Sequence, residues 1–185
     1  MSTTTATPAT VTTWNIDPAH SAVEFKVKHM MISHVKGSVR GLKGALTLDE
    51  TDPDRSSVKA TAEIGTLSTG DEQRDGHLKS PAFFDAATFP ELAFESTAVK
   101  QTGDGEYQVS GSLTVHGVTK PVIFAVEGPT APGKDPWGNL RVGVTATAKI
   151  NRKDFGLTWN SALETGGVLV GDDVTLTIDA QFIKS

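Results

Sequence analysis

The chain has 185 residues, of which 37% are apolar and 21% charged, a balance typical of one soluble globular domain rather than a disordered protein. Its formal net charge of −5 argues against nucleic acid as the main partner, because phosphate backbones are bound by clustered lysine and arginine. The sequence contains no cysteine, which excludes disulfides, thiol catalysis and cysteine-ligated zinc.

The N-terminal segment differs in composition from everything that follows it. Residues 1–12 are rich in threonine and alanine and have little to bury, so we expect a disordered tail ahead of a single domain at 13–185. The tail has neither a basic start nor an apolar run, which predicts a cytoplasmic protein without a secretory signal. No transmembrane segment is expected, because no stretch of the chain approaches the roughly 18 apolar residues that such a helix needs.

Eight segments after the tail show the period-two alternation of half-buried β-strands. In one of them Val142 and Val144 share a face, while Arg141 and Thr145 share the other. Short turns rich in glycine join several of the segments, which indicates antiparallel hairpins. The predicted strands span residues 22–28, 35–48, 57–66, 92–101, 106–115, 120–130, 139–150 and 172–184.

Strand length favours a closed barrel. Strands of ten residues or more reach about 33 Å, and closing them into a barrel removes exposed edges. The sequence therefore predicts an all-β fold, an eight-stranded antiparallel up-and-down (lipocalin-like) barrel with one short helix between strands 3 and 4. An immunoglobulin-like sandwich is the alternative. Small residues expected on the inner face favour a bore that holds a ligand: Ala60, Ala62, Ala146, Ala148 and Ala180.

The segment from residue 67 to 90 interrupts the strand pattern and predicts the helix. Thr69 and Glu72 have the spacing of a capping box at its start, and Pro81 ends it. Arg74, His77 and Leu78 then share one helix face by their i,i+3 and i,i+4 spacing, and an aromatic cluster follows. A segment of this kind in an all-β chain packs over an opening or a core edge.

Among the five histidines, His29 is the clearest candidate for a site. It follows Val23, Phe25 and Val27 on one strand face, so it shares the interior with them if they face inward. A hydrogen-bonded histidine at the rim is an equally good interpretation. The histidine spacings predict no metal site, and no G-x-S-x-G nucleophile elbow is present. These observations favour binding over catalysis.

Seven motifs in order resemble the YceI-like proteins, which are lipocalin-like barrels described as polyisoprenoid-binding. They include WNIDPAHSAVEFKVKH at 14–29, LSTGDEQRDGHLKSPAFFD at 67–85 and KINRKDFGLTW at 149–159. The resemblance implies an eight-stranded barrel with a helix by its mouth, a bore that holds an isoprenoid lipid, and a homodimer. We expect no cofactor and no catalytic residue, because the sequence lacks enzyme signatures. The candidate ligand-binding residues are Phe25, Val27, His29, Arg74, His77, Leu78, Phe84 and Trp159.

The expected function is to bind a long-chain isoprenoid lipid, such as a polyprenyl phosphate, a polyprenyl pyrophosphate or an isoprenoid quinone. The apolar tail would occupy the bore, and Arg74 and His77 would orient the head. A structural interpretation of the helix pairs Arg74 with Asp71 and leaves Asp75 solvated. Two other functions stay open: a filled-barrel stress or interaction protein without a lipid, and a hydrolase that uses His20, His29 and Asp75.

Overall fold

The structure, a computed structural model, describes residues 10–185. Within them the chain forms ten strands, one α-helix, α1 (Glu72–Lys79), and the 3-10 helices η1 (Pro18–His20), η2 (Pro53–Arg55) and η3 (Arg152–Phe155). No helix in this range is long and apolar enough to cross a membrane. The strands are β1 (Val11–Ile16), β2 (Ala22–His29), β3 (Ser33–Asp49), β4 (Ser57–Ser68), β5 (Glu91–Gly103), β6 (Glu106–Val115), β7 (Val118–Glu127), β8 (Gly133–Lys134), β9 (Leu140–Asn151) and β10 (Val170–Lys184).

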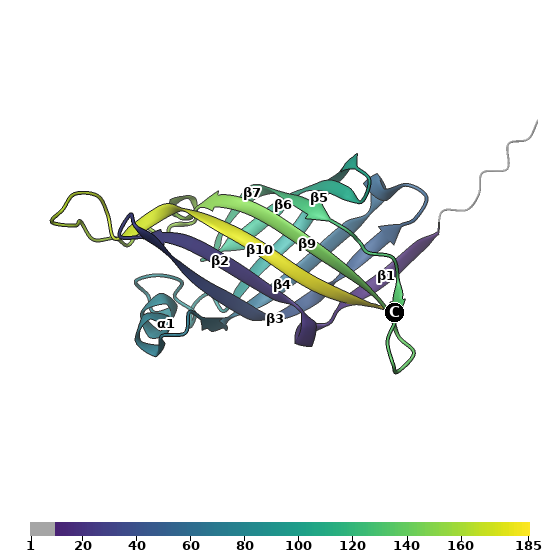
Figure 1. Ribbon diagram of the computed structural model, residues 1–185, viewed down its shortest axis with the longest axis horizontal. Helices are drawn as coiled ribbons and strands as arrows, with labels where there is room; N and C mark the ends of the chain where they lie inside the picture. Colours follow the sequence, from purple (N-terminus) through teal and green to yellow (C-terminus); the bar gives the residue numbers. More distant parts are fainter. Residues whose placement is uncertain (1–9) are drawn as a thin grey trace, which may run out of the picture.

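Eight of the strands form a closed antiparallel barrel in the order β2-β3-β4-β5-β6-β7-β9-β10 (Figure 1). β10 closes it by pairing with β2 on one side and with β9 on the other. The predicted eight-stranded barrel is confirmed, and the sandwich is wrong because the strands make one continuous sheet. The short helix is also confirmed, since α1 lies between β4 and β5, the third and fourth strands of the barrel.

β1 is a strand that the sequence pattern did not predict. It pairs with β10 on one side and β3 on the other, so it continues the line of β2 beyond η1. Asp17 is the N-cap of η1 and marks the break between the two. Residues 1–9 of the predicted tail lie outside the described residues, whereas 11 and 12 already belong to β1 and pair with β3.

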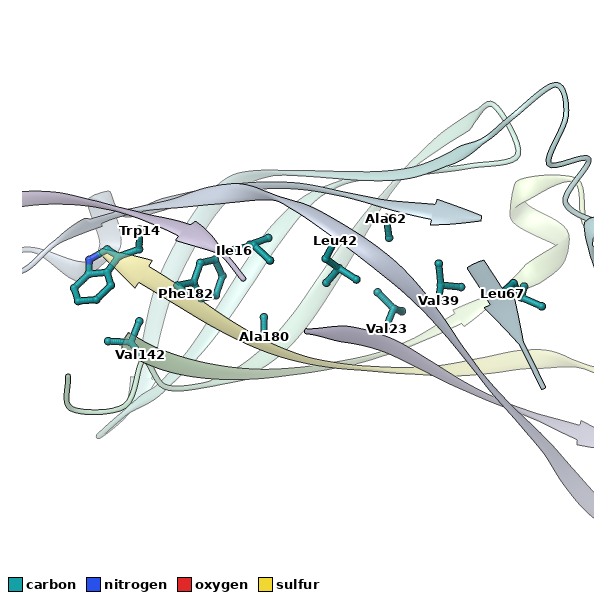
Figure 2. Close-up of a cluster of buried hydrophobic side chains, with 10 residues drawn as sticks. All are labelled: Trp14, Ile16, Val23, Val39, Leu42, Ala62, Leu67, Val142, Ala180 and Phe182. Atoms are coloured by element: carbon teal, nitrogen blue, oxygen red, sulfur yellow. The ribbon is translucent and has the colours of Figure 1, made fainter. Parts of the chain in front are cut away.

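Buried side chains point inward from the strands in two clusters. Figure 2 shows the first cluster, which runs along the inside of the barrel from Trp14 to Leu67. Trp14 and Phe182 both belong to it and are 2% and 4% exposed, so large side chains fill this part of the interior. The second cluster contains Phe124 and Phe155. The period-two alternation of the strands supplies most of both clusters, and Phe155 comes from η3.

The two ends of the barrel carry different connections. α1, the β2–β3 turn at residues 30–32 and the long β9–β10 connection at 152–169 lie at one end, which we call the helix end (Figure 1). The C-terminus and β1 lie at the opposite end (Figure 1). The α1 segment and the β9–β10 connection therefore lie at the same end of the barrel.

Candidate functional site

The barrel encloses a cavity of about 380 Å³. Its wall takes side chains from all eight barrel strands and is almost wholly apolar, with rings such as Phe25, Phe94 and Phe124. The volume falls within the range of about 300–1,000 Å³ that is usual for small-molecule sites. Four of the five small residues expected to face inward line the cavity: Ala60, Ala62, Ala146 and Ala180. The bore is therefore suited to an apolar molecule.

All eight residues predicted to bind a ligand lie on the wall of this cavity. β2 carries three of them, α1 carries three more, one follows α1, and one belongs to the β9–β10 connection. His29 shares its inward face with Phe25 and Val27, as the alternation predicts. The eight are Phe25, Val27, His29, Arg74, His77, Leu78, Phe84 and Trp159. Their contact with a ligand stays a prediction.

The wall of the cavity extends to the helix end. His77 lines the cavity and is itself exposed, and Arg74 beside it is half-buried. Polar and cationic groups thus stand at the rim of a bore whose wall is apolar. This is the arrangement that an amphiphile with one long tail requires.

The start of α1 differs from the predicted capping box of Thr69 and Glu72. The N-cap is Asp71, whose carboxylate accepts a hydrogen bond from the Arg74 amide at 2.9 Å. Thr69 is committed elsewhere, because its amide and hydroxyl both donate to Asp75 Oδ1, at 2.7 and 2.6 Å. Burial acts to raise the pKa of Asp75, but these two bonds outweigh it and hold that pKa below its ordinary value. Asp75 is a fixed structural group and not a solvated carboxylate.

The side chain of Arg74 lies against Thr69. Its Nε donates to the Thr69 hydroxyl at 2.7 Å and its Nη2 donates to the Thr69 carbonyl at 3.2 Å. The predicted ion pair between Arg74 and Asp71 is wrong. Asp71 instead accepts a hydrogen bond from the backbone amide of Arg74. Nη1 makes no hydrogen bond to any other residue of the described range 10–185. Part of the guanidinium therefore stays available to an anionic group at the rim.

Three rings join the α1 segment to the β9–β10 connection. The imidazole of His77 meets the rings of Trp159 and Phe83 edge-on, with centroids 4.8 and 5.2 Å apart. Phe83 and Trp159 lie 5.2 Å apart. Phe83 is 6% exposed and also lines the cavity, yet sequence reasoning did not include it in the site. Its place in the aromatic cluster after Pro81 was the only signal.

The buried side chain of Arg152 stabilises the β9–β10 connection by hydrogen bonds to backbone carbonyls. It is 3% exposed, and it donates to the carbonyls of Leu157, Trp159 and Gly171 at 2.7, 2.8 and 2.8 Å. Burial lowers the pKa of Arg152 from its ordinary value, and the nearby Asp172 acts in the opposite direction. Because it binds the backbone of Trp159, Arg152 positions the indole at the cavity rim.

The residues of the hydrolase hypothesis do not come together at the cavity. His29 lies on its wall, whereas His20 belongs to η1, with Nδ1 2.8 Å from Asp17 Oδ2. Asp75 is engaged by Thr69 and is not part of the wall. Within residues 10–185, no three histidine, aspartate or glutamate side chains are grouped closely enough to hold a metal ion.

Relatives of this chain are bacterial proteins of similar length. A UPF0312 protein of Staphylococcus aureus (strain N315) is 41% identical over 175 residues, which are 93% of this chain and 98% of that protein. A UPF0312 protein of Yersinia pestis (strain Pestoides F) is 39% identical over 156 residues, which are 83% of this chain and 80% of that protein.

Solved structures share the barrel. BcnA of Burkholderia cenocepacia superposes with a TM-score of 0.75 at 22% identity, over 90% of this chain and 98% of that one. A polyisoprenoid binding domain from Saccharophagus degradans superposes with a TM-score of 0.66 at 14% identity, over 93% of this chain and 98% of that one. At these identities the likeness establishes the fold. The YceI-like domain matches residues 14–182. The chain therefore belongs to the YceI-like family.

Proposed function

We propose that the protein binds a long-chain isoprenoid lipid, or a similar amphiphile, with the tail in the bore and the head at the helix end. The observation that carries this proposal is an apolar cavity of about 380 Å³ that meets Arg74 and His77 at its rim. Polyprenyl phosphates, polyprenyl pyrophosphates and isoprenoid quinones have this shape. The role is carriage, storage or sequestration of the lipid, and not its chemical conversion.

The affinity comes from the tail. Burial of one CH₂ group contributes about 0.8 kcal/mol, so a five-carbon isoprene unit contributes roughly 3–4 kcal/mol before costs. Association costs about 4–15 kcal/mol in lost freedom, which a few buried units offset. Phe25, Val27, Leu78 and Phe84 supply part of the apolar wall against which these units would pack. The wall needs no specific polar contact to hold a tail.

The head group determines which lipid binds best. Arg74 presents an uncommitted Nη1 at the rim, and His29 and His77 lie on the same cavity wall. A phosphate or pyrophosphate accepts charge-assisted hydrogen bonds from a guanidinium. A quinone carbonyl would accept weaker ones. We therefore favour a phosphorylated head.

The Saccharophagus degradans structure, described as a polyisoprenoid binding domain, supports this proposal because its barrel has the same fold. The filled-barrel alternative requires a bore blocked by side chains, and a cavity lined by four alanines counts against it. We retain the homodimer, which rests on the family resemblance, as part of the proposal. The oligomeric mass is read in the experiment that follows.

The test is native mass spectrometry of freshly purified protein, with its organic extract analysed in parallel. We expect one lipid adduct per chain whose mass matches a prenyl lipid or a quinone, and the same spectrum gives the oligomer. A lipid-free mass that does not change after polyprenyl lipids are added would overturn the proposal.

A further inference from the structure

Large apolar side chains are exposed at the tip of the β2–β3 turn. Met30, Met31 and Ile32 are 42%, 51% and 80% exposed, and Val168 of the β9–β10 connection is 37% exposed beside them. Met31 joins the two segments, because a Cβ placed on Gly167 would lie 3.1 Å from Met31 Cγ. We call these four residues the tip. Exposed apolar side chains that gather in one place often mark an interaction site, whereas singly scattered ones need no explanation.

The backbone of the turn makes this exposure more informative. Met30 and Met31 have φ values of 51° and 62°, the left-handed region that costs a residue with a side chain roughly 1–2 kcal/mol. A β-turn whose two central residues both have positive φ is normally built from Asn-Gly or a similar pair. Two methionines at these positions favour neither folding nor solubility. Contact with a binding partner is therefore the best explanation of these exposed side chains.

A band of basic residues borders the tip on the outer face of the barrel. Lys28 lies opposite His34, and Lys26 lies opposite Lys36, across the β2–β3 pair. All four side chains are exposed, and none forms an ion pair within residues 10–185. Like charges directly opposite each other in a sheet are unfavourable. A strained apolar turn and a repulsive pair thus lie next to each other.

The acids of the adjacent strands form no ion pair with this band. On the adjacent β10, Asp172 and Asp173 are engaged by Lys153 and Lys149, each at 3.2 Å. Glu24 is the next outward residue on β2, on the side away from the tip. The band is therefore a local basic surface on a chain whose net charge is −5.

The tip adjoins the wall of the cavity at the helix end. The Met30 amide donates to the Leu169 carbonyl at 2.8 Å, and Leu169 lines the cavity. His29, which precedes Met30, also lines it. In Figure 1 the β2–β3 turn and the β9–β10 connection lie at the same end of the barrel as α1. A partner bound at the tip would therefore lie beside this end of the cavity.

We infer that the tip and its basic band dock the protein on the surface of an anionic lipid bilayer, with the helix end toward the membrane. Apolar side chains flanked by lysines bind such surfaces by burying the former at the acyl boundary and placing the latter near lipid phosphates. This extends the proposed function to the place where a lipid enters or leaves the bore. The docking itself requires no bound prenyl lipid.

The test is co-sedimentation with vesicles of phosphatidylcholine, with and without phosphatidylserine, at low and high salt. One variant carries Met30→Asn, Met31→Gly and Ile32→Ser, which suits the turn conformation and so preserves the fold. A second carries Lys26→Glu, Lys28→Glu and Lys36→Glu. Ile123→Ser, at a position 59% exposed on β7, and Lys100→Glu, exposed on β5, are the matched controls.

We expect the unaltered protein to bind the anionic vesicles and to be released by salt. The charge variant should lose at least about 100-fold in affinity, since each lysine near an anionic surface contributes roughly 5-fold and each glutamate is repelled. The turn variant should lose binding as well, while both controls bind as the unaltered protein does. Absence of binding to anionic vesicles, or a turn variant that binds normally, would overturn the inference.

A turn variant that changes the oligomeric mass and leaves vesicle binding intact would also overturn it, because the tip would then cover a second copy of the chain. Vesicle binding is measured here without a prenyl ligand, and the mass spectrum of the purified protein is recorded without vesicles. Failure of docking and failure of lipid binding are therefore separate results.

Discussion

The indole of Trp159 meets the imidazole of His77 edge-on, with 4.8 Å between ring centroids and 87° between ring planes. His77 belongs to α1 and Trp159 to the β9–β10 connection, so the contact joins the two segments that border the helix end. Both residues line the cavity. Phe83 packs against both rings, so opening the rim here means separating three aromatic side chains.

Replacing Trp159→Ala should speed the release of a bound prenyl lipid. An aromatic pair contributes about 0.5–1.5 kcal/mol beyond its burial, and Trp159 makes two such contacts, so we expect a rise in dissociation rate of roughly 10-fold. Stopped-flow release of a fluorescent polyprenyl alcohol measures it. Trp137→Ala, at a position 81% exposed, is the control. An unchanged rate would mean that the ligand does not leave past this contact.

The bore depends on a glycine opposite a phenylalanine. Gly37 pairs with Phe25 across β2 and β3, and a Cβ on Gly37 would lie 2.3 Å from Phe25 Cζ. Gly37→Ala should lower the free energy of unfolding by about 1–3 kcal/mol, because the ring must turn away. Gly65→Ala, with open space around its Cβ, should not lower it. Urea unfolding compares the two variants. Adding Phe25→Leu to Gly37→Ala should recover part of the lost free energy of unfolding.

Arg141 links two carboxylates whose charged forms stabilise the fold. Hydrogen bonds from Arg141 and then His20 lower the pKa of Asp17 to about 2, and Arg141 likewise lowers the pKa of Asp135. Because both folded-state values are depressed, their contribution is complete above the ordinary pKa of about 3.9 and is lost as pH falls toward 2.

Arg141→Gln should therefore lower stability at neutral pH and flatten its decline between about pH 4 and pH 2. Urea midpoints at a series of pH values measure both effects. Arg40→Gln, which removes an exposed arginine from β3, should leave the profile unchanged. A variant with the same acid dependence as the unaltered protein would show that other groups control it.

Much of the barrel was predictable because its signal is local. The alternation of Val23, Phe25, Val27 and His29 assigns the inner face of β2 without any knowledge of its neighbours, and the structure confirms that assignment. The spacing of the helix residues likewise predicted three side chains on one face, and all three line the cavity. In both cases the period of the element fixes the direction of the side chain.

What was missed depends on distant contacts. β1 is six residues long with polar positions between its apolar ones, and it is held by β3 and β10, which are remote in sequence. Thr69 and Asp71 both have the composition of an N-cap, and the bond from Thr69 to Asp75 decides between them. Arg152 belongs to the YceI-like motif at 149–159, but only the folded connection shows that its side chain is buried.

Filling part of the bore should weaken binding of a long chain and leave the fold intact. Ala146 lies on the cavity wall, whereas Ala125 on the neighbouring β7 points outward and is exposed. Ala146→Phe should weaken binding 10-fold or more, because the loss of two buried CH₂ groups already removes about 1.6 kcal/mol. Ala125→Phe should bind normally. Native mass spectrometry with a polyprenyl series compares them, and equal binding would place the ligand outside the bore.

Arg74 separates recognition of the head from a purely structural role of the helix. Removing a hydrogen bond to a charged group costs about 1.5–3 kcal/mol, so Arg74→Ala should weaken binding of a pyrophosphate-headed polyprenyl lipid roughly 10- to 100-fold. Binding of the corresponding alcohol should change little, since its tail contacts are unaltered. Lys79→Ala removes a cation from the same helix at a position that does not line the cavity, and it should affect neither ligand. Equal losses for both lipids in Arg74→Ala would show that Arg74 acts through Thr69 on the shape of the rim, and that the head is held by other groups.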